Sequence, residues 1–249
     1  MSENKKCLVF TFKISVVCML LCLLIFVLCF FIYFKKPMQR ESVFSMASVG
    51  YTVVIDAGHG GRDGGAVSED GLLEKNLNLA VSSRISDILN ICGIKTVMTR
   101  TNDSLVCDEN NPDLKGKIKM TDLSNRLKIA RNSDAAMFVS IHMNKFSVEK
   151  YKGLQVYYSK NNDNSEVIAS LIQDNVRAIL QPKNNREIKA AGNNIYLLDR
   201  LEIPAVLIEC GFLSNKEESE KLADLVYQTQ LSMVISDCIM TNLFTNANN

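Results

Sequence analysis

The sequence predicts an α/β fold: a single mixed sheet with helices on both faces, preceded by an amino-terminal transmembrane helix. Two observations predict the sheet. Apolar runs of strand length alternate with longer segments of helical periodicity, and some of these runs are apolar throughout, as in strands buried on both faces. A third observation, an uncharged stretch of 21 residues near the amino terminus, predicts the membrane helix.

The amino-terminal segments come first in the chain. Residues 1–13 form a short basic segment, residues 14–34 a transmembrane signal-anchor and residues 35–50 a polar linker. The apolar core of a cleaved signal peptide has only ~7–15 residues, so an uncleaved anchor is favoured. Cleavage near Ala47, after a small-x-small sequence, is the alternative. The flanking charges are nearly balanced and give no orientation.

Residues 51–249 are predicted to form one domain, in which the first predicted strand, Val53–Ile55, ends in a glycine-rich turn. A helix follows over 74–91, with an apolar stripe and a stop at Gly93. Further elements are predicted in this order: a strand at 94–99, a long polar loop at 101–120, a helix from 121, strands at 136–141 and 154–159, a helix at 165–180, strands at 195–198 and 205–208, a helix capped by Asn215, and a final helix through Leu231.

Composition excludes two classes of site. The formal net charge is +1, and the basic residues concentrate around the apolar segment, so no basic face for nucleic acid is predicted. The chain has eight cysteines but no CxxC pair, which argues against a cysteine zinc site or a redox motif.

Both histidines of the chain occupy the same kind of position. His59 lies in the glycine-rich turn after the first strand, and His142 follows the apolar run 136–141. Ligands bind where the carboxyl ends of strands emerge from an open α/β sheet. Imidazoles together with a carboxylate are typical zinc ligands, so a metal site is one interpretation. A structural turn with a solvated histidine is the other.

Two carboxylates are candidates by their position. Glu74 begins the helix that follows the His59 turn, although an acid there also compensates the helix dipole. Glu209 closes the apolar run 205–208, where a charge is paired, exposed or functional. Asp56 and Asp63 compete as carboxylates near His59, but a turn-orienting role and a plain loop role are the simpler interpretations.

Four segments resemble the zinc-dependent N-acetylmuramoyl-L-alanine amidase family. They are VVIDAGHGGRDGGA, LLEKNLNLA, SDAAMFVSIHMNKF and IPAVLIECGFLSNKEE, and together they span Val53 to Glu218. The single anchor and the lack of a wall-binding repeat look most like the germination-specific members that act on the spore cortex. Met143, Lys145 and Cys210 depart from the commonest family pattern.

The resemblance implies one Zn²⁺ ion held by His59, Glu74 and His142, with Glu209 as the catalytic carboxylate. Arg126, which matches a recurrent arginine of the family, and Asn144 are the candidate substrate-binding residues. The implied reaction is hydrolysis of the amide between the lactyl group of N-acetylmuramic acid and L-alanine. A zinc peptidase acting on cell-wall peptides and a membrane-anchored, non-catalytic glycan-binding protein are the alternatives.

The resemblance also implies partners and a location. Peptidoglycan is the expected substrate, and the amino-terminal helix would hold the enzyme at a membrane. The catalytic domain would lie outside the cytoplasm, in the cell envelope or the forespore intermembrane space, or be secreted if cleaved near Ala47. An activating protein partner stays open, with loop 101–120 as the place to look for it.

Overall fold

The structure is a computed structural model that describes residues 50–108 and 110–246. The predicted basic segment, signal-anchor and nearly all of the linker lie outside these residues. Within the described part of the chain, no helix has the length and apolar character needed to cross a membrane.

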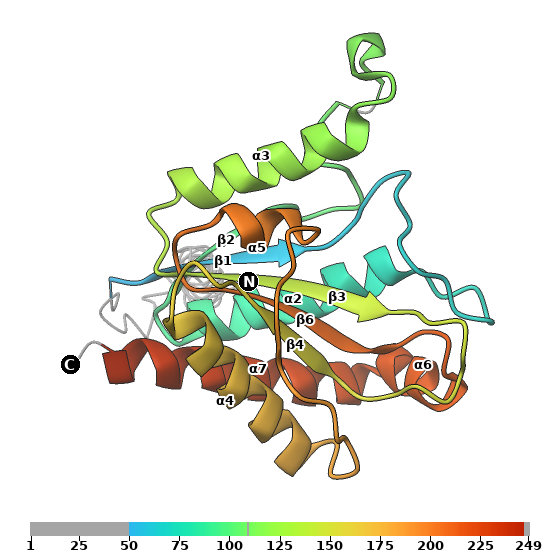
Figure 1. The fold of residues 1–249 in the computed structure, drawn as a ribbon, viewed down its shortest axis with the longest axis vertical. Helices are drawn as coiled ribbons and strands as arrows, with labels where there is room; N and C mark the ends of the chain where they lie inside the picture. The colour runs from blue at the N-terminus through green and yellow to red at the C-terminus, as the bar shows by residue number, and fades with distance from the viewer. Residues whose placement is uncertain (1–49, 109, 247–249) are drawn as a thin grey trace, which may run out of the picture. The chain divides into compact units, whose positions relative to one another are not determined.

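A six-stranded mixed sheet organises the domain, with strand order β2-β1-β3-β6-β4-β5 (Figure 1). All neighbouring strands pair in parallel except β4 and β6, which are antiparallel. The carboxyl ends of β1, β3 and β6 therefore meet at one edge of the sheet. The strands are β1 (Thr52–Ala57), β2 (Lys95–Met98), β3 (Met137–Asn144), β4 (Gln155–Tyr158), β5 (Lys189–Ala190) and β6 (Ala205–Phe212).

Helices cover both faces of this sheet, as predicted. In Figure 1, α3 and α5 lie above it, and α2, α4 and α7 lie below. The described helices are α2 (Glu74–Ile91), α3 (Ile118–Asn132), α4 (Asn164–Ile179), α5 (Tyr196–Arg200), α6 (Lys216–Ala223) and α7 (Leu225–Asn246), with a 3₁₀ turn at Pro112–Leu114.

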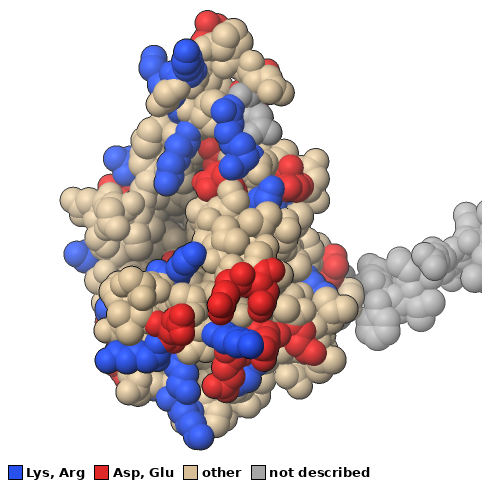
Figure 2. Space-filling view, turned by 90° about the vertical axis from the view of Figure 1, so that its right-hand side faces the viewer, with Lys and Arg blue, Asp and Glu red and all other residues tan. Residues whose placement is uncertain are grey.

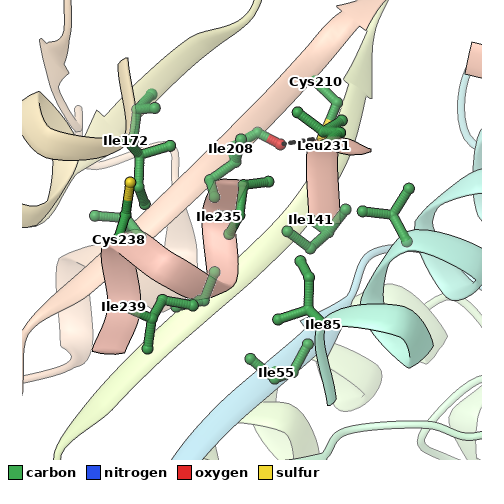
Figure 3. Packing of buried hydrophobic residues seen from close by; sticks show 14 of the residues in the cluster. Ile55, Ile85, Ile141, Ile172, Ile208, Cys210, Leu231, Ile235, Cys238 and Ile239 are labelled. Carbon is green, nitrogen blue, oxygen red and sulfur yellow. Dashed lines mark hydrogen bonds between the residues drawn. The ribbon is translucent and has the colours of Figure 1, made fainter. Parts of the chain in front are cut away.

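The core is divided by the sheet because alternate strand residues point to opposite faces. Val53 and Ile55 join the larger cluster against α2, α4 and α7, whereas Val54 joins the smaller cluster against α3 and α5. Figure 3 shows the larger cluster, where Ile85 of α2 lies close to Ile141 of β3. Each fully buried aliphatic side chain contributes about 1.5–3 kcal/mol, so this packing fixes the strand ends that carry the site.

Several boundaries follow the sequence prediction closely. Helix α2 has the predicted bounds, and Leu77, Val81 and Ile85 are buried; Leu89, not Ile88, completes the buried stripe. Asn215 caps α6 by accepting a hydrogen bond from the Glu218 backbone N–H.

Three predictions of local structure were wrong. Residues 195–198 begin helix α5 rather than a strand, because a short apolar run does not distinguish the two and Leu197 and Leu198 pack into the smaller cluster as helical residues. Helix α3 begins at Ile118, within the predicted loop. His142 and Glu209 lie inside β3 and β6 instead of after them, because the two strands stay paired through these residues.

Candidate metal centre and active site

The turn after β1 is shaped by two glycines that admit ligand-type side chains. A Cβ added at Gly58 would lie 2.3 Å from the His142 ring, and one at Gly65 would lie 2.4 Å from Glu74 Oε2. Gly65 also has a φ of 67°, and His59 itself takes a φ of 60°, which is uncommon for a residue with a side chain. The turn is therefore folded tightly around His59, Glu74 and His142.

These three side chains converge on one point from three different elements. Glu74 Oε1 lies 3.2 Å from His59 Nε2 and 3.0 Å from His142 Nδ1. One ligand atom from each residue falls within 4.8 Å of the other two. The two imidazole rings have centroids 5.0 Å apart and an interplanar angle of 73°. The structure thus brings together the three residues that the family resemblance implies as metal ligands.

Glu74 is held in a buried position by several donors. The Ala66 N–H donates to Oε2 at 2.7 Å, and the Met143 N–H donates to Oε1 at 3.1 Å. Burial alone would raise the pKa of this carboxyl, but the hydrogen bonds and charges of His142 and His59 outweigh it and lower the pKa below its usual range. Glu74 is therefore an ionised carboxylate that can bind a cation.

His59 has a second partner that orients its ring. Asp63 Oδ2 lies 2.9 Å from His59 Nδ1, which leaves Nε2 directed at Glu74. A carboxylate on the remote nitrogen of a histidine fixes its tautomer and raises its basicity as a ligand. Asp63, interpreted from sequence as a plain loop residue, is thus the outer partner of His59.

We expect Asp63→Asn to lower metal affinity by ~10–100-fold, because the amide keeps the shape but not the charge that holds His59. The measurement is competition with a chelator of known affinity, and Asp70→Asn, an exposed acid on the same loop, is the control. An unchanged affinity in Asp63→Asn would show that His59 orients itself without this partner.

The donor set fits zinc. Catalytic zinc sites use three protein ligands of histidine and carboxylate type and keep a fourth position open. The site offers two imidazole nitrogens and one carboxylate oxygen that lie close enough together to bind one ion, which matches that description.

Glu209 lies beside this centre, because it pairs with His142 in the register of β3 and β6. Its Oε2 is buried and has no hydrogen-bond partner among the described residues. Burial, the largest influence, raises the pKa of the Glu209 carboxyl above its usual range. A buried carboxylate oxygen without a partner is costly to maintain, and such oxygens occur at functional sites.

A cavity of about 640 Å³ opens next to the centre, on the face of the sheet that α3 and α5 cover. His59, His142 and Glu209 line it. Its wall also carries charges of both signs, from Arg62 and Lys119 and from Asp63 and Asp122. Figure 2 faces the edge at which β1 and β3 end: the surface is hollowed beneath its upper part, and basic and acidic side chains are interspersed on it. Among the described residues drawn on that face, the basic side chains do not form one continuous stripe of the kind that binds nucleic acid.

Arg126 and Asn144, the two predicted substrate-binding residues, occupy different surroundings. The Arg126 guanidinium is buried and donates to Asp56, Asp122 and the backbone carbonyls of Ala57 and His59. Asn144 ends β3 and is not among the residues that line the cavity. Their roles in substrate binding stay predictions.

Known proteins are similar to this chain in sequence and in fold. Residues 53–241 match the family model described as N-acetylmuramoyl-L-alanine amidase. The chain belongs to the N-acetylmuramoyl-L-alanine amidase family. This amidase is 34% identical over 215 residues to the germination-specific N-acetylmuramoyl-L-alanine amidase of Bacillus subtilis, a match that covers 86% of this chain and 89% of the relative.

Solved structures agree with the assignment of this amidase. The CwlD amidase of Clostridioides difficile, in complex with the GerS lipoprotein, has a TM-score of 0.75 and 39% identity, over 78% of this chain and 99% of that one. The amidase AmiC2 of Nostoc punctiforme has a TM-score of 0.67 and 31% identity, over 78% and 97% of the two chains.

Three supporting residues were missed or undervalued in the sequence. Asn78 donates to the Gly58 carbonyl and to Glu74, and Arg100 donates to the carbonyls of Ala57 and Gly58. Asn78 stands four residues after Glu74 on α2, and this helical spacing was an available signal. Asp63 lies in a turn, where a spacing of four residues from His59 predicts no contact. Arg100 follows β2, and only the folded sheet brings it to the turn.

The close approach at Gly58 gives a direct test of the turn. We expect Gly58→Ala to push the His142 ring out of place and to lower metal affinity by at least ~10-fold, as large as the loss of an outer ligand partner. Gly64→Ala is the matched control, because its Cβ would meet only Leu73, at an ordinary 3.6 Å. The two variants are compared by zinc content after dialysis; equal zinc content would refute this account of Gly58.

Proposed function

We propose that this amidase is a zinc-dependent hydrolase of the bond between the lactyl carbonyl of N-acetylmuramic acid and the L-alanine nitrogen. The observation that carries the proposal is the convergence of His59, Glu74 and His142 on one point, with the unpaired carboxylate of Glu209 on the adjoining strand. The family of the chain supplies the substrate class.

In this proposal His59, Glu74 and His142 hold the zinc ion, and Glu209 moves the proton. Bound zinc supplies Lewis-acid chemistry, which polarises an amide carbonyl and makes water a nucleophile at neutral pH. Glu209 accepts a proton from the attacking water and delivers it to the departing nitrogen. The C–O bond forms first, and the C–N bond breaks once the nitrogen has received the proton, so the products are a lactyl carboxylate and a stem peptide with a free amino terminus.

The test is the product released from purified peptidoglycan by the full chain in detergent. We expect intact stem peptides and glycan with free lactyl groups, loss of activity with a chelator, and recovery with zinc. Shortened peptides would instead support the peptidase alternative, and binding without any release would support the non-catalytic glycan-binding alternative.

We further propose that the cellular substrate is spore-cortex peptidoglycan and that the enzyme works outside the cytoplasm, anchored by residues 14–34. The germination-specific B. subtilis relative supports the cortex as substrate. In spores that lack this enzyme, every muramic acid residue of the cortex should then keep a peptide substituent on its lactyl group. Normal cortex in such spores would contradict the proposal.

A protein partner is part of this proposal. The CwlD amidase structure contains the GerS lipoprotein, which motivates a search for a partner of this chain in the same compartment. Activity of the purified chain, with and without proteins recovered from crosslinked sporulating cells, is the measurement. Full activity of the chain alone would remove the need for a partner.

A further inference from the structure

An aromatic cluster lies beyond the carboxyl ends of β3 and β6. The Phe146 and Tyr151 rings meet edge to face with centroids 4.9 Å apart, and Tyr151 stacks on Phe212 at 6.4 Å and 30°. The Arg186 guanidinium lies 4.9 Å from the centroid of the Phe212 ring. These four planar side chains, Phe146, Tyr151, Phe212 and Arg186, are called the aromatic platform.

The platform extends from the strand pairing beside Glu209 to solvent. Its inner residue, Arg186, donates to Gln155, which is the registered partner of Glu209 across β4 and β6. At its outer end, Phe146 is 51% exposed and Tyr151 is 39% exposed, whereas Phe212 is buried. The cluster therefore leads outward from the carboxylate that is proposed to move the proton.

The exposed rings are held in place by a well-anchored loop. The Phe146 N–H donates to Ser214 Oγ, the Asn215 side chain donates to the Glu149 carbonyl, and the Gly153 N–H donates to Glu218. These bonds tie residues 146–153 to the segment that follows β6. Two large rings kept exposed on an anchored loop next to a catalytic site indicate a contact surface rather than a mobile connection.

A substrate cut at the lactyl group has two parts that leave the reaction centre in different directions. The stem peptide carries amides and carboxylates, and the cavity offers partners of both signs: the cations of Arg62 and Lys119 and the carboxylates of Asp63 and Asp122. The sugar rings of the glycan are themselves uncharged and expose C–H faces, and the negative face of an aromatic ring attracts such C–H groups. None of the four platform residues lines the cavity, so the two surfaces are separate.

We propose that the aromatic platform binds the glycan strand of peptidoglycan, with a sugar ring packed against Phe146, while the cavity receives the stem peptide. Among the ring contacts of the described residues, Phe146 meets only Tyr151 and has no cation stacked on it, which leaves it open to a sugar. This inference rests on the proposed function, because it assigns the two halves of the same substrate.

The test uses the full chain in detergent, treated with chelator, and peptide-free strands of alternating N-acetylglucosamine and N-acetylmuramic acid as the probe. Phe146→Ala should weaken binding by roughly 3- to 10-fold, in line with the loss of one aromatic contact. Phe146→Tyr should bind as the wild type does, and Phe146→Leu should bind as weakly as Phe146→Ala. Equal unfolding midpoints show that the variants fold.

Phe244→Ala is the matched control. Phe244 is 38% exposed and also pairs edge to face with a tyrosine, Tyr51, which precedes β1 at the opposite edge of the sheet from the site. It should bind the strands as the wild type does. Wild-type binding by Phe146→Ala, or equal losses in the two alanine variants, would overturn the proposal.

Two further measurements separate this inference from the proposed function. Binding of a free stem peptide should be unaffected by Phe146→Ala; a loss confined to the peptide would overturn the assignment of the platform to glycan. On polymeric substrate the variant should show a raised KM with an unchanged kcat. Failure of the wild type to hydrolyse even a one-sugar muramoyl peptide would count against the proposed reaction, whereas the glycan-binding result stands independently of it.

Discussion

Glu209→Gln is expected to lower kcat by ~10²–10⁴-fold, the usual contribution of a positioned general base. The glutamine keeps the shape of the side chain but accepts no proton from water. Because Glu209 Oε2 has no partner among the described residues, the replacement breaks no hydrogen bond of that oxygen. The unfolding midpoint and the zinc content should therefore stay at the wild-type level.

The measurement for Glu209→Gln is steady-state release of stem peptide, together with zinc content and thermal unfolding. Glu202→Gln is the control, because this exposed glutamate precedes the same strand. Undiminished turnover in Glu209→Gln would show that another group moves the proton.

His142→Ala is expected to abolish both metal binding and turnover. Removing one of three ligands should cost more than the ~10–100-fold in affinity that follows from loss of an outer partner. It also removes the 3.0 Å contact with Glu74, which leaves that buried carboxylate with fewer donors. Activity should fall to background and should not return at ordinary zinc concentrations.

Asn144→Ala is the control for His142→Ala, because it changes the same strand two residues later and lies outside the ligand cluster. It should retain one zinc per chain, and a raised KM would support the prediction that Asn144 contacts substrate. Zinc retained by His142→Ala with wild-type affinity would remove His142 from the ligand set.

Much of the fold could be predicted from local sequence signals, and α2 shows why. Its apolar stripe, its acidic first residue and the glycine after its end are all short-range signals, and the helix has the predicted bounds. The run at 195–198 misled because four apolar residues satisfy a strand or a helix equally, and only packing against Val54 and Phe138 decides between them.

The candidate site was predictable in part, because histidine and glutamate are residue types that bind metals and can be recognised in the sequence. The two histidines and Glu74 are the only ligand-type group of this kind that meets at one point among the described residues. The reach of β3 through His142 was not predictable, because it depends on pairing with a strand more than 60 residues later. The aromatic platform depends on long-range contacts of the same kind, so no window of sequence reveals it.

The pairing of His142 with Glu209 has a consequence for how this enzyme can diversify. A proposed metal ligand and the proposed proton carrier sit opposite each other on neighbouring strands, whose spacing of ~4.8 Å is a constant of β-sheets. Loops 101–117 and 145–154 contribute no member of that pair. Replacement of those loops would change the polymer specificity and the affinity of the enzyme. The reaction would stay the same among its homologues.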